Sequence, residues 1–130
     1  FILHVDSTFN GAYKDMSNYL AKGIDLPDCF FCMNDIISYG CIKALKEKGI
    51  RIPEDISIIG FDNLPMSATM EPPLTTVDIS KQMMGHYAII LLDELLHSSD
   101  SNVESAVKIL IGANLVCRKS VKGDPEVAIR

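Results

Sequence analysis

Hydrophobic positions along the chain alternate between short runs rich in β-branched residues and longer stretches with helical spacing. The short runs predict strands, and the longer stretches predict helices that begin after polar residues. Strands are expected over residues 1–5, 29–33, 56–61, 74–79, 107–111 and 114–119, and helices over residues 8–22, 35–48 and 80–97. Regular alternation of this kind is typical of βαβ units, so the pattern predicts an α/β fold with a parallel sheet.

The ends of the predicted helices coincide with capping residues. Asp6 and Ser7 are cap candidates for the first helix, and the pair Asn34-Asp35 supplies an N-cap for the second. Gly23 and Gly49 follow these helices, as is common at helix ends. In the second helix, six residues are expected on one buried face: Ile36, Ile37, Gly40, Cys41, Ala44 and Leu45.

Two further segments depart from a simple amphipathic pattern. Residues 64–73 contain three prolines and predict an irregular connection with at most one helical turn. The helix over residues 80–97 carries apolar residues around more than half of its circumference. Such a helix requires burial on nearly all sides, so another part of a protein must cover it. A polar loop over residues 98–102 and a loose tail over residues 123–130 complete the chain.

Composition narrows the class of protein. The 130 residues are 48% hydrophobic, which suffices for one core but leaves little room for a second independent domain. A net charge of -5 and a pI near 5.0 do not favour contact with phosphates, so any DNA contact is expected outside this chain. No apolar run approaches the roughly 20 residues of a membrane span. The start at Phe1-Ile2-Leu3, without Met or signal peptide, indicates a piece of a larger, cytoplasmic protein.

Four cysteines occur, all within apolar segments, which favours buried free thiols over a disulfide framework. Cys29 and Cys32 form a CxxC string inside a predicted strand. An offset of three residues in a strand places two side chains on opposite faces, which argues against a redox pair or half of a zinc site. We therefore expect no metal site.

The sequence offers no catalytic or nucleotide-binding motif. The three histidines are isolated, and no nucleophile motif surrounds them. No glycine-rich phosphate loop is present either. We therefore expect no enzymatic activity, no catalytic residues and no cofactor, because an enzyme on an α/β sheet would need one of these features.

The strongest candidate for a binding site lies where two predicted strands end. Asn34-Asp35 and Asp62-Asn63 directly follow these strands, and ligands of parallel sheets bind outside their carboxyl ends. Carboxylate and amide groups suit a ligand that bears hydroxyl groups, such as a sugar or nucleoside. Asp35 could serve instead as a helix cap, and Asp62 as a turn residue.

Asp6 and Phe9 follow the first predicted strand and are weaker candidates for ligand contact. The alternative for Asp6 is helix capping, and for Phe9 it is a hydrophobic staple at the start of the helix.

An ordered series of motifs resembles the effector-binding core of the lactose-repressor/galactose-repressor (LacI/GalR) family. The series extends through nearly the whole chain. It comprises Asn34-Asp35, Gly40, Ala44-Leu45, residues 49–63, residues 72–77, Met84-Gly85, Ala88, Leu115-Val116, Arg118 and Ser120.

The resemblance implies a periplasmic-binding-protein-like (type I) fold, a three-layer parallel sheet with flanking helices, arranged as two lobes around a ligand. Residues 1–130 would form a partial effector-binding domain, namely the C-terminal lobe. Within it, residues 80–112 would normally belong to the other lobe, which would cover the apolar helix. Without that cover, the helix is expected to pack on a neighbouring chain or to rearrange. A helix-turn-helix DNA-binding domain would lie outside this chain.

The resemblance also assigns roles to individual residues. Asn34 and Asp62 correspond to positions that contact the effector in the family. Asp6 replaces an aromatic residue that stacks on the ligand in many members, and Phe9 is a candidate substitute for that ring. The helix after Asn34 contributes to a dimer interface in the family, and Tyr39 and Ile42 are expected on its outer face.

The function implied is that of a transcriptional regulator. A small, sugar-like effector would shift the arrangement of two lobes in a homodimer, and this change would alter DNA binding by the absent domain. The alternative is a periplasmic sugar-binding protein of a transporter, which has the same fold. A helix-turn-helix or a signal peptide upstream would distinguish the two.

Overall fold

The computed structural model describes residues 1–97 and 107–123 and divides into two compact units. The first unit comprises Phe1–Asp78 together with the residues from Leu115 onward, and the second is Ile79–Asn114. The predicted loop over residues 98–102 and the tail beyond residue 123 lie outside the described residues. The first unit carries the candidate site.

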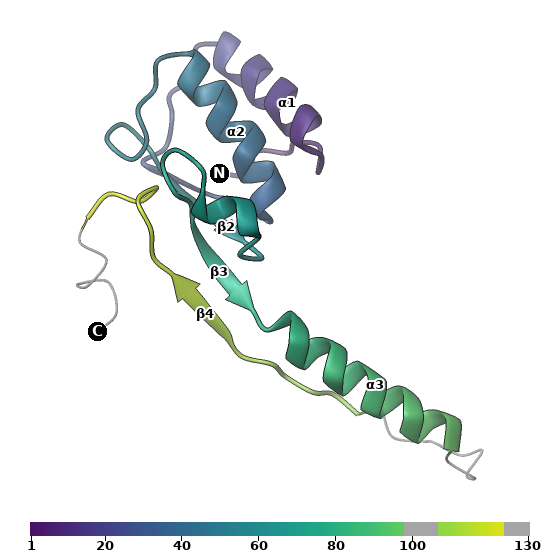
Figure 1. Cartoon of the computed structure of the whole chain (residues 1–130). Helices are drawn as coiled ribbons and strands as arrows, with labels where there is room; N and C mark the ends of the chain where they lie inside the picture. The colour runs from purple at the N-terminus through teal and green to yellow at the C-terminus, as the bar shows by residue number, and fades with distance from the viewer. Residues whose placement is uncertain (98–106, 124–130) are drawn as a thin grey trace. The chain divides into compact units, whose positions relative to one another are not determined.

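The strands form one sheet in the order β1-β2-β3-β4, and Figure 1 labels β2, β3 and β4. Their bounds are Cys29–Phe31 for β1, Ser57–Phe61 for β2, Thr75–Ile79 for β3 and Ala113–Val116 for β4. β2 pairs in parallel with both β1 and β3, with Phe31 opposite Ile59 and Gly60 opposite Thr76. The predicted α/β class and the parallel pairing of the central strands are confirmed.

Helices α1 (Phe9–Ala21) and α2 (Asp35–Glu47) pack against each other, and α2 packs against β2. Their buried residues form one core with Ile58 of β2 and Leu74, both of which are fully buried. The close approach of the two helices requires Gly40. A Cβ at this position would overlap the Phe9 carbonyl oxygen and the Tyr13 backbone nitrogen. The predicted helices therefore form where expected, with ends that differ by one residue.

Of the three layers expected, the described residues of the first unit supply the sheet and one helical layer. Phe30 and Ile58 face the helices and belong to the core or pack against it. Their neighbours Cys29 and Phe31 point to the other face, as the period of a strand requires. Phe31 remains 55% exposed there. The second face of the sheet is thus open along β1.

Residues 1–5 form no strand, contrary to expectation. Phe1 packs its ring against Tyr19 and Phe30, with ring centroids 5.9 Å and 6.3 Å apart. The segment and β1 line a largely apolar cavity of about 690 Å³. β1 is the edge strand of the sheet, because it pairs with β2 and residues 1–5 form no strand beside it.

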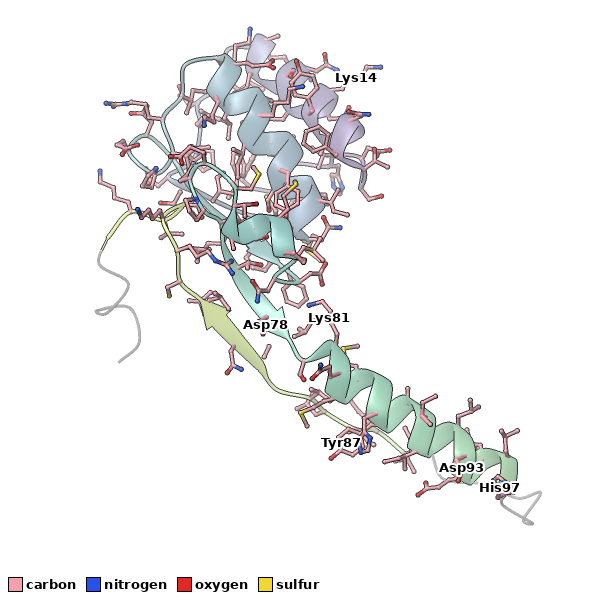
Figure 2. All side chains as sticks on the ribbon, in the orientation of Figure 1. Lys14, Asp78, Lys81, Tyr87, Asp93 and His97 are labelled. Carbon is pink, nitrogen blue, oxygen red and sulfur yellow. The ribbon has the colours of Figure 1, made fainter. Side chains whose placement is uncertain are left out.

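The second unit contains α3 (Lys81–His97). This helix begins one residue later than predicted and ends at the predicted residue. None of its residues is buried. Figure 2 labels Tyr87, Asp93 and His97 along this helix. Among the ring pairs of the described residues, the Tyr87 ring contacts only that of its neighbour His86, edge-on, with centroids 5.3 Å apart. The His97 ring nitrogen lies 3.2 Å from the Asp93 carboxylate. These contacts are local to the helix, so its apolar surface lacks cover within its own unit.

The last two predicted strands reduce to one. Residues 107–111 form no strand, and β4 begins at Ala113 and ends at Val116. After β4, the Arg118 N–H donates to the Thr75 hydroxyl, whereas the Lys119 N–H donates to the Pro73 carbonyl, which lies before β3. The buried Ser120 hydroxyl donates to the Ile58 carbonyl at 2.6 Å and accepts from the Thr75 N–H at 2.8 Å. Ser120 therefore anchors the end of the chain to two strands.

The cysteines are all free, but only two of them are buried. Cys32 and Cys41 belong to the core, Cys117 is half-buried, and Cys29 is exposed. Cys29 and Cys32 do face opposite ways, as the strand period predicts. The expectation that all four are buried is wrong for Cys29, because the sheet face on which it lies is open.

The outer-face placement of Tyr39 and Ile42 is also wrong. Tyr39 is 3% exposed and Ile42 is 1% exposed, and both belong to the core. α2 is covered on two sides, by α1 on one and by the segment after β2 on the other, so its buried face is wider than a single apolar stripe. These two residues have no surface with which to contact a second chain.

Candidate functional site

Asn34 and Asp62 follow neighbouring parallel strands at equal distances along the chain. Phe31 of β1 pairs with Ile59 of β2, and each candidate residue lies three positions beyond its member of that pair. Equal offsets past a parallel pair bring two residues to the same edge of a sheet. The sheet therefore positions an amide and a carboxylate on the edge where ligands of such folds bind. Both residues are half-buried.

Asn34 is the N-cap of α2. Its Oδ1 accepts a hydrogen bond from the Ile37 N–H at 2.8 Å, and its backbone is extended, as an N-cap requires. The cap is thus Asn34 and not Asp35. Capping uses only the oxygen of the amide. The NH₂ group of Asn34 takes no part in the capping bond and is a hydrogen-bond donor.

Asp35 is fully buried, which excludes the direct ligand contact considered for it. Its Oδ2 accepts from the Leu64 N–H at 2.7 Å and from the Ser67 hydroxyl at 2.5 Å. Its Oδ1 accepts from the Thr76 hydroxyl at 2.6 Å. A buried carboxylate is tolerated when hydrogen bonds satisfy it, and here three donors do so. Asp35 therefore joins α2 to β3 and to the segment after β2.

Tyr39 extends this network by one step. Its hydroxyl lies 2.7 Å from Ser67 Oγ, and because Ser67 donates its proton to Asp35, Tyr39 is the donor to Ser67. Burial raises the pKa of the Tyr39 hydroxyl, and the nearby Asp35 carboxylate adds to this effect. The hydroxyl therefore stays protonated and continues to donate. Ser67 belongs to the short 3₁₀ helix η1 (Pro65–Ala68), which is the single helical turn expected in this segment.

The turn after β2 has an unusual backbone. Asp62 has φ of 106° and Asn63 has φ of 49°, and both are in the region that side chains rarely adopt. Of the described residues, these are the only two besides glycines with positive φ. Such conformations cost energy and persist only where the surrounding structure fixes them, and they concentrate at functional sites.

The backbone N–H groups of residues 62–64 are each bound by the framework. They donate to the Val77 carbonyl at 2.9 Å, the Thr76 hydroxyl at 3.3 Å and the Asp35 carboxylate at 2.7 Å, in chain order. These bonds hold the strained turn against β3 and α2.

Arg118 holds the same turn through a side chain. Its guanidinium donates to Asn63 Oδ1 and to the Leu74 carbonyl, both at 2.7 Å. Its own N–H donates to the Thr75 hydroxyl at 2.8 Å. Sequence reasoning assigned no site role to Arg118, because 55 residues separate it from Asn63. The only signal was its place in the ordered series of family motifs.

Asp6 is engaged at the start of α1. Its Oδ1 accepts from the Thr8 N–H at 2.7 Å and from the Thr8 hydroxyl at 2.6 Å, and these bonds lower the pKa of Asp6. The N-cap of α1 is Thr8, whose hydroxyl accepts from the Gly11 N–H, and not Asp6 or Ser7. Asp6 thus supports the cap and remains exposed and ionised.

Phe9 is half-buried on the side of α1 that faces α2. The Lys43 ammonium of α2 lies 5.9 Å from the centre of the Phe9 ring and 4.4 Å from that of Tyr13. Contact of this kind is a cation–π interaction. Phe9 therefore has a structural partner, and its role toward a ligand stays a prediction.

The cavity of about 690 Å³ is separate from these candidates. It lies along residues 1–5 and β1, and none of Asn34, Asp62, Asp6 and Phe9 is among the residues that line it. Within residues 1–97 and 107–123, no three His, Cys, Asp or Glu side chains are placed to hold a metal ion. In the same ranges, no helix has the length and hydropathy needed to cross a bilayer.

The fold is that of an α/β domain with polar residues at the carboxyl edge of a parallel sheet, and comparison with known proteins gives its family. Residues 2–121 match the model of the periplasmic binding protein-like domain. The chain belongs to this family, in the form found in LacI-family transcriptional regulators.

Curated relatives include repressors named HTH-type transcriptional repressor PurR. That of Haemophilus influenzae strain Rd is 46% identical over 110 residues, and that of Pasteurella multocida is also 46% identical over 110 residues. In both cases the match covers 85% of this chain and 32% of the relative. The chain thus spans about a third of the length of the curated relatives it matches.

Solved structures agree. A LacI-family regulator from Enterococcus faecium with bound ribose is 28% identical with a TM-score of 0.74, and the match covers 92% of this chain and 42% of that one. A regulator from Arthrobacter sp. in complex with lactose gives the same identity and TM-score, with 91% and 43% covered. A putative LacI-family regulator from Sanguibacter keddieii reaches a TM-score of 0.86 at 25% identity, covering 94% and 46%.

Proposed function

We propose that this chain is the effector-binding part of a LacI-type transcriptional repressor that senses a sugar or sugar-like small molecule. The observation that supports this most strongly is the pair Asn34 and Asp62, which two parallel strands deliver to one edge of the sheet. An amide that donates and a carboxylate that accepts suit vicinal hydroxyl groups. The bound ribose, lactose and cellobiose of structural neighbours favour the same ligand class.

In this proposal the chain is a partial domain, the C-terminal lobe of a two-lobed protein. The division into two units supports it, since Ile79–Asn114 separates from the rest as a piece of the other lobe would. The large apolar side chains of α3 are exposed, with Leu95 at 61% and Leu96 at 73%. An apolar surface of this kind is stable in water only when covered, and the remainder of the other lobe would cover it.

The mechanism proposed is allosteric, and no bond is made or broken. An effector that binds one arrangement of two lobes more tightly than another shifts the population between them. In a cytoplasmic homodimer, this shift would change operator binding by a DNA-binding domain that lies outside this chain. The repressor names of the curated relatives favour this function over that of a transporter's periplasmic sugar-binding protein.

Substitution of Asp62 in the intact regulator tests the site. Asp62→Ala should weaken binding by roughly 1.5 to 3 kcal/mol, the range for hydrogen bonds to a charged group. The measurement is isothermal titration calorimetry with ribose, lactose, cellobiose and guanosine as probes. Asp55→Ala is the matched control, because Asp55 precedes β2 and lies at the other end of that strand. Equal affinities of the two variants for a probe that the regulator binds would refute the assignment.

A further inference from the structure

The direction in which Asp62 points depends on a turn that is strained. Two consecutive residues with positive φ, Asp62 and Asn63, follow β2 directly. A turn of this kind relaxes unless bonds on several sides fix it. Three backbone N–H bonds hold residues 62–64 from the side of β3 and α2. They leave the side chain of Asn63 to be fixed separately.

Arg118 fixes that side chain. It comes after β4, and its planar guanidinium reaches Asn63 Oδ1 with one nitrogen and the Leu74 carbonyl with another, both at 2.7 Å. The Leu74 carbonyl belongs to the backbone that leads into β3, and the Arg118 N–H is bound to Thr75. Arg118 is therefore itself anchored to Leu74, just before β3, and to Thr75, the first residue of β3, while its third bond reaches the turn.

A lysine could not reproduce this arrangement. The guanidinium presents several N–H donors in a rigid fork, whereas an ammonium is a compact point charge on a flexible stem. Only the fork can bond two acceptors that lie in fixed and different directions without rearrangement. The geometry thus requires the shape of arginine in addition to its charge.

We propose that Arg118 is a positioning residue of the effector site, which acts by holding Asn63 and thereby fixing the turn that aims Asp62. This inference rests on the proposed function, because it assigns Asp62 to the effector. Asp35 holds the same turn from within the core, through the Leu64 N–H. Arg118 is half-buried, so it can be exchanged with less damage to the core than Asp35.

The test compares Arg118→Lys with Arg51→Lys in the intact regulator. Arg51 is a matched control because it also bonds a side chain, that of Asp55, but precedes β2 at the opposite end of the strand. Arg118→Lys should weaken the binding of ribose, lactose or cellobiose about five- to tenfold, while the thermal midpoint stays close to that of Arg51→Lys. Amide hydrogen exchange at Asn63 and Leu64 should accelerate in Arg118→Lys alone.

The outcomes separate the two proposals. If the wild-type regulator binds none of the sugars, the proposed ligand class fails, and hydrogen exchange of the turn still decides whether Arg118 fixes it. Unchanged exchange at Asn63 and Leu64 would overturn the inference. So would an affinity loss in Arg118→Lys no larger than in Arg51→Lys for a sugar whose binding Asp62→Ala weakens. An affinity loss that merely follows a lowered thermal midpoint would reduce Arg118 to a structural role and also overturn it.

Discussion

The hydroxyl of Thr76 donates a hydrogen bond of 2.6 Å to the buried carboxylate of Asp35, which joins the second residue of β3 to the first residue of α2. The carboxylate also binds the Leu64 N–H and the Ser67 hydroxyl. One fully buried side chain thus connects the strand, the helix and the turn that follows the neighbouring strand. The stability of the first unit and the geometry of its candidate site depend on the same group.

Removal of this carboxylate should destabilise the protein strongly. Asp35→Ala leaves two buried hydroxyls and the half-buried Leu64 N–H without their acceptor, and each unsatisfied group costs about 1–3 kcal/mol, so we expect a loss of at least about 3 kcal/mol. Asp35→Asn keeps the shape and one acceptor oxygen and should cost less. Urea unfolding followed by circular dichroism measures both. A loss below about 1 kcal/mol for Asp35→Ala would contradict the role given to the network.

Burial predicts different effects of truncating two isoleucines of α2. Ile42 is 1% exposed and Ile36 is 40% exposed. Ile42→Ala should cost about 2–4 kcal/mol, because it leaves a cavity in the core. Ile36→Ala, the matched control on the same helix, should cost about 1 kcal/mol or less. Similar losses in urea unfolding of the two variants would show that Ile42 is not in the core.

Two glycines in helices should respond to alanine in opposite directions. A Cβ at Gly40 overlaps the backbone of α1, so Gly40→Ala should push the helices apart at a cost of about 1–3 kcal/mol. A Cβ at Gly85 meets nothing within 4 Å, so Gly85→Ala should favour α3 by about 0.5–1 kcal/mol through helix propensity. Denaturation and far-UV circular dichroism test the pair. Stabilisation by Gly40→Ala would mean that α1 and α2 are not in close contact.

The Arg51–Asp55 pair should make a small contribution to stability that disappears in acid. Hydrogen bonds from Arg51 lower the pKa of Asp55 from 3.8 to about 2. A carboxyl whose pKa is lowered by folding stabilises the protein above its unfolded value of 3.8, and this stabilisation is lost as the pH falls through about 2. The difference in unfolding free energy between wild type and Asp55→Asn should therefore shrink as the pH falls from about 4 and disappear only below about pH 2. Because Asp55 is solvent-exposed, added salt should reduce the difference at neutral pH.

Much of the fold could be predicted from the sequence because its signals are local. The helical spacing of α1 and α2 and the continuous apolar run of β2 located these elements to within one or two residues. The positions of Asn34 and Asp62 followed from them, because parallel strands bring their carboxyl ends to one edge. Such inferences need only the period of each element and the order of the strands.

The parts that could not be predicted depend on contacts between distant residues. Helical periodicity shows one apolar stripe of α2, but it does not reveal that the segment after β2 covers a second side, and so Tyr39 and Ile42 were misplaced. Asp35 has the residue type and position of a helix cap. Its role as a buried acceptor depends on Thr76 and Ser67, which are more than thirty residues away in the sequence. Residues 1–5 have the composition of a strand, but a strand also needs backbone hydrogen bonds to a neighbouring strand, and composition does not show whether these form.

The backbone at Asp62 limits which residue types can occupy this position. A side chain at φ of 106° is tolerated best by aspartate, asparagine and glycine, so few residue types can occupy position 62 without added strain. The backbone conformation thus restricts the residue types at position 62 independently of any bond that the side chain makes. Under the proposed function, variation in ligand preference would therefore fall on other residues of the site, such as Asn34, whose φ of -156° is ordinary extended backbone.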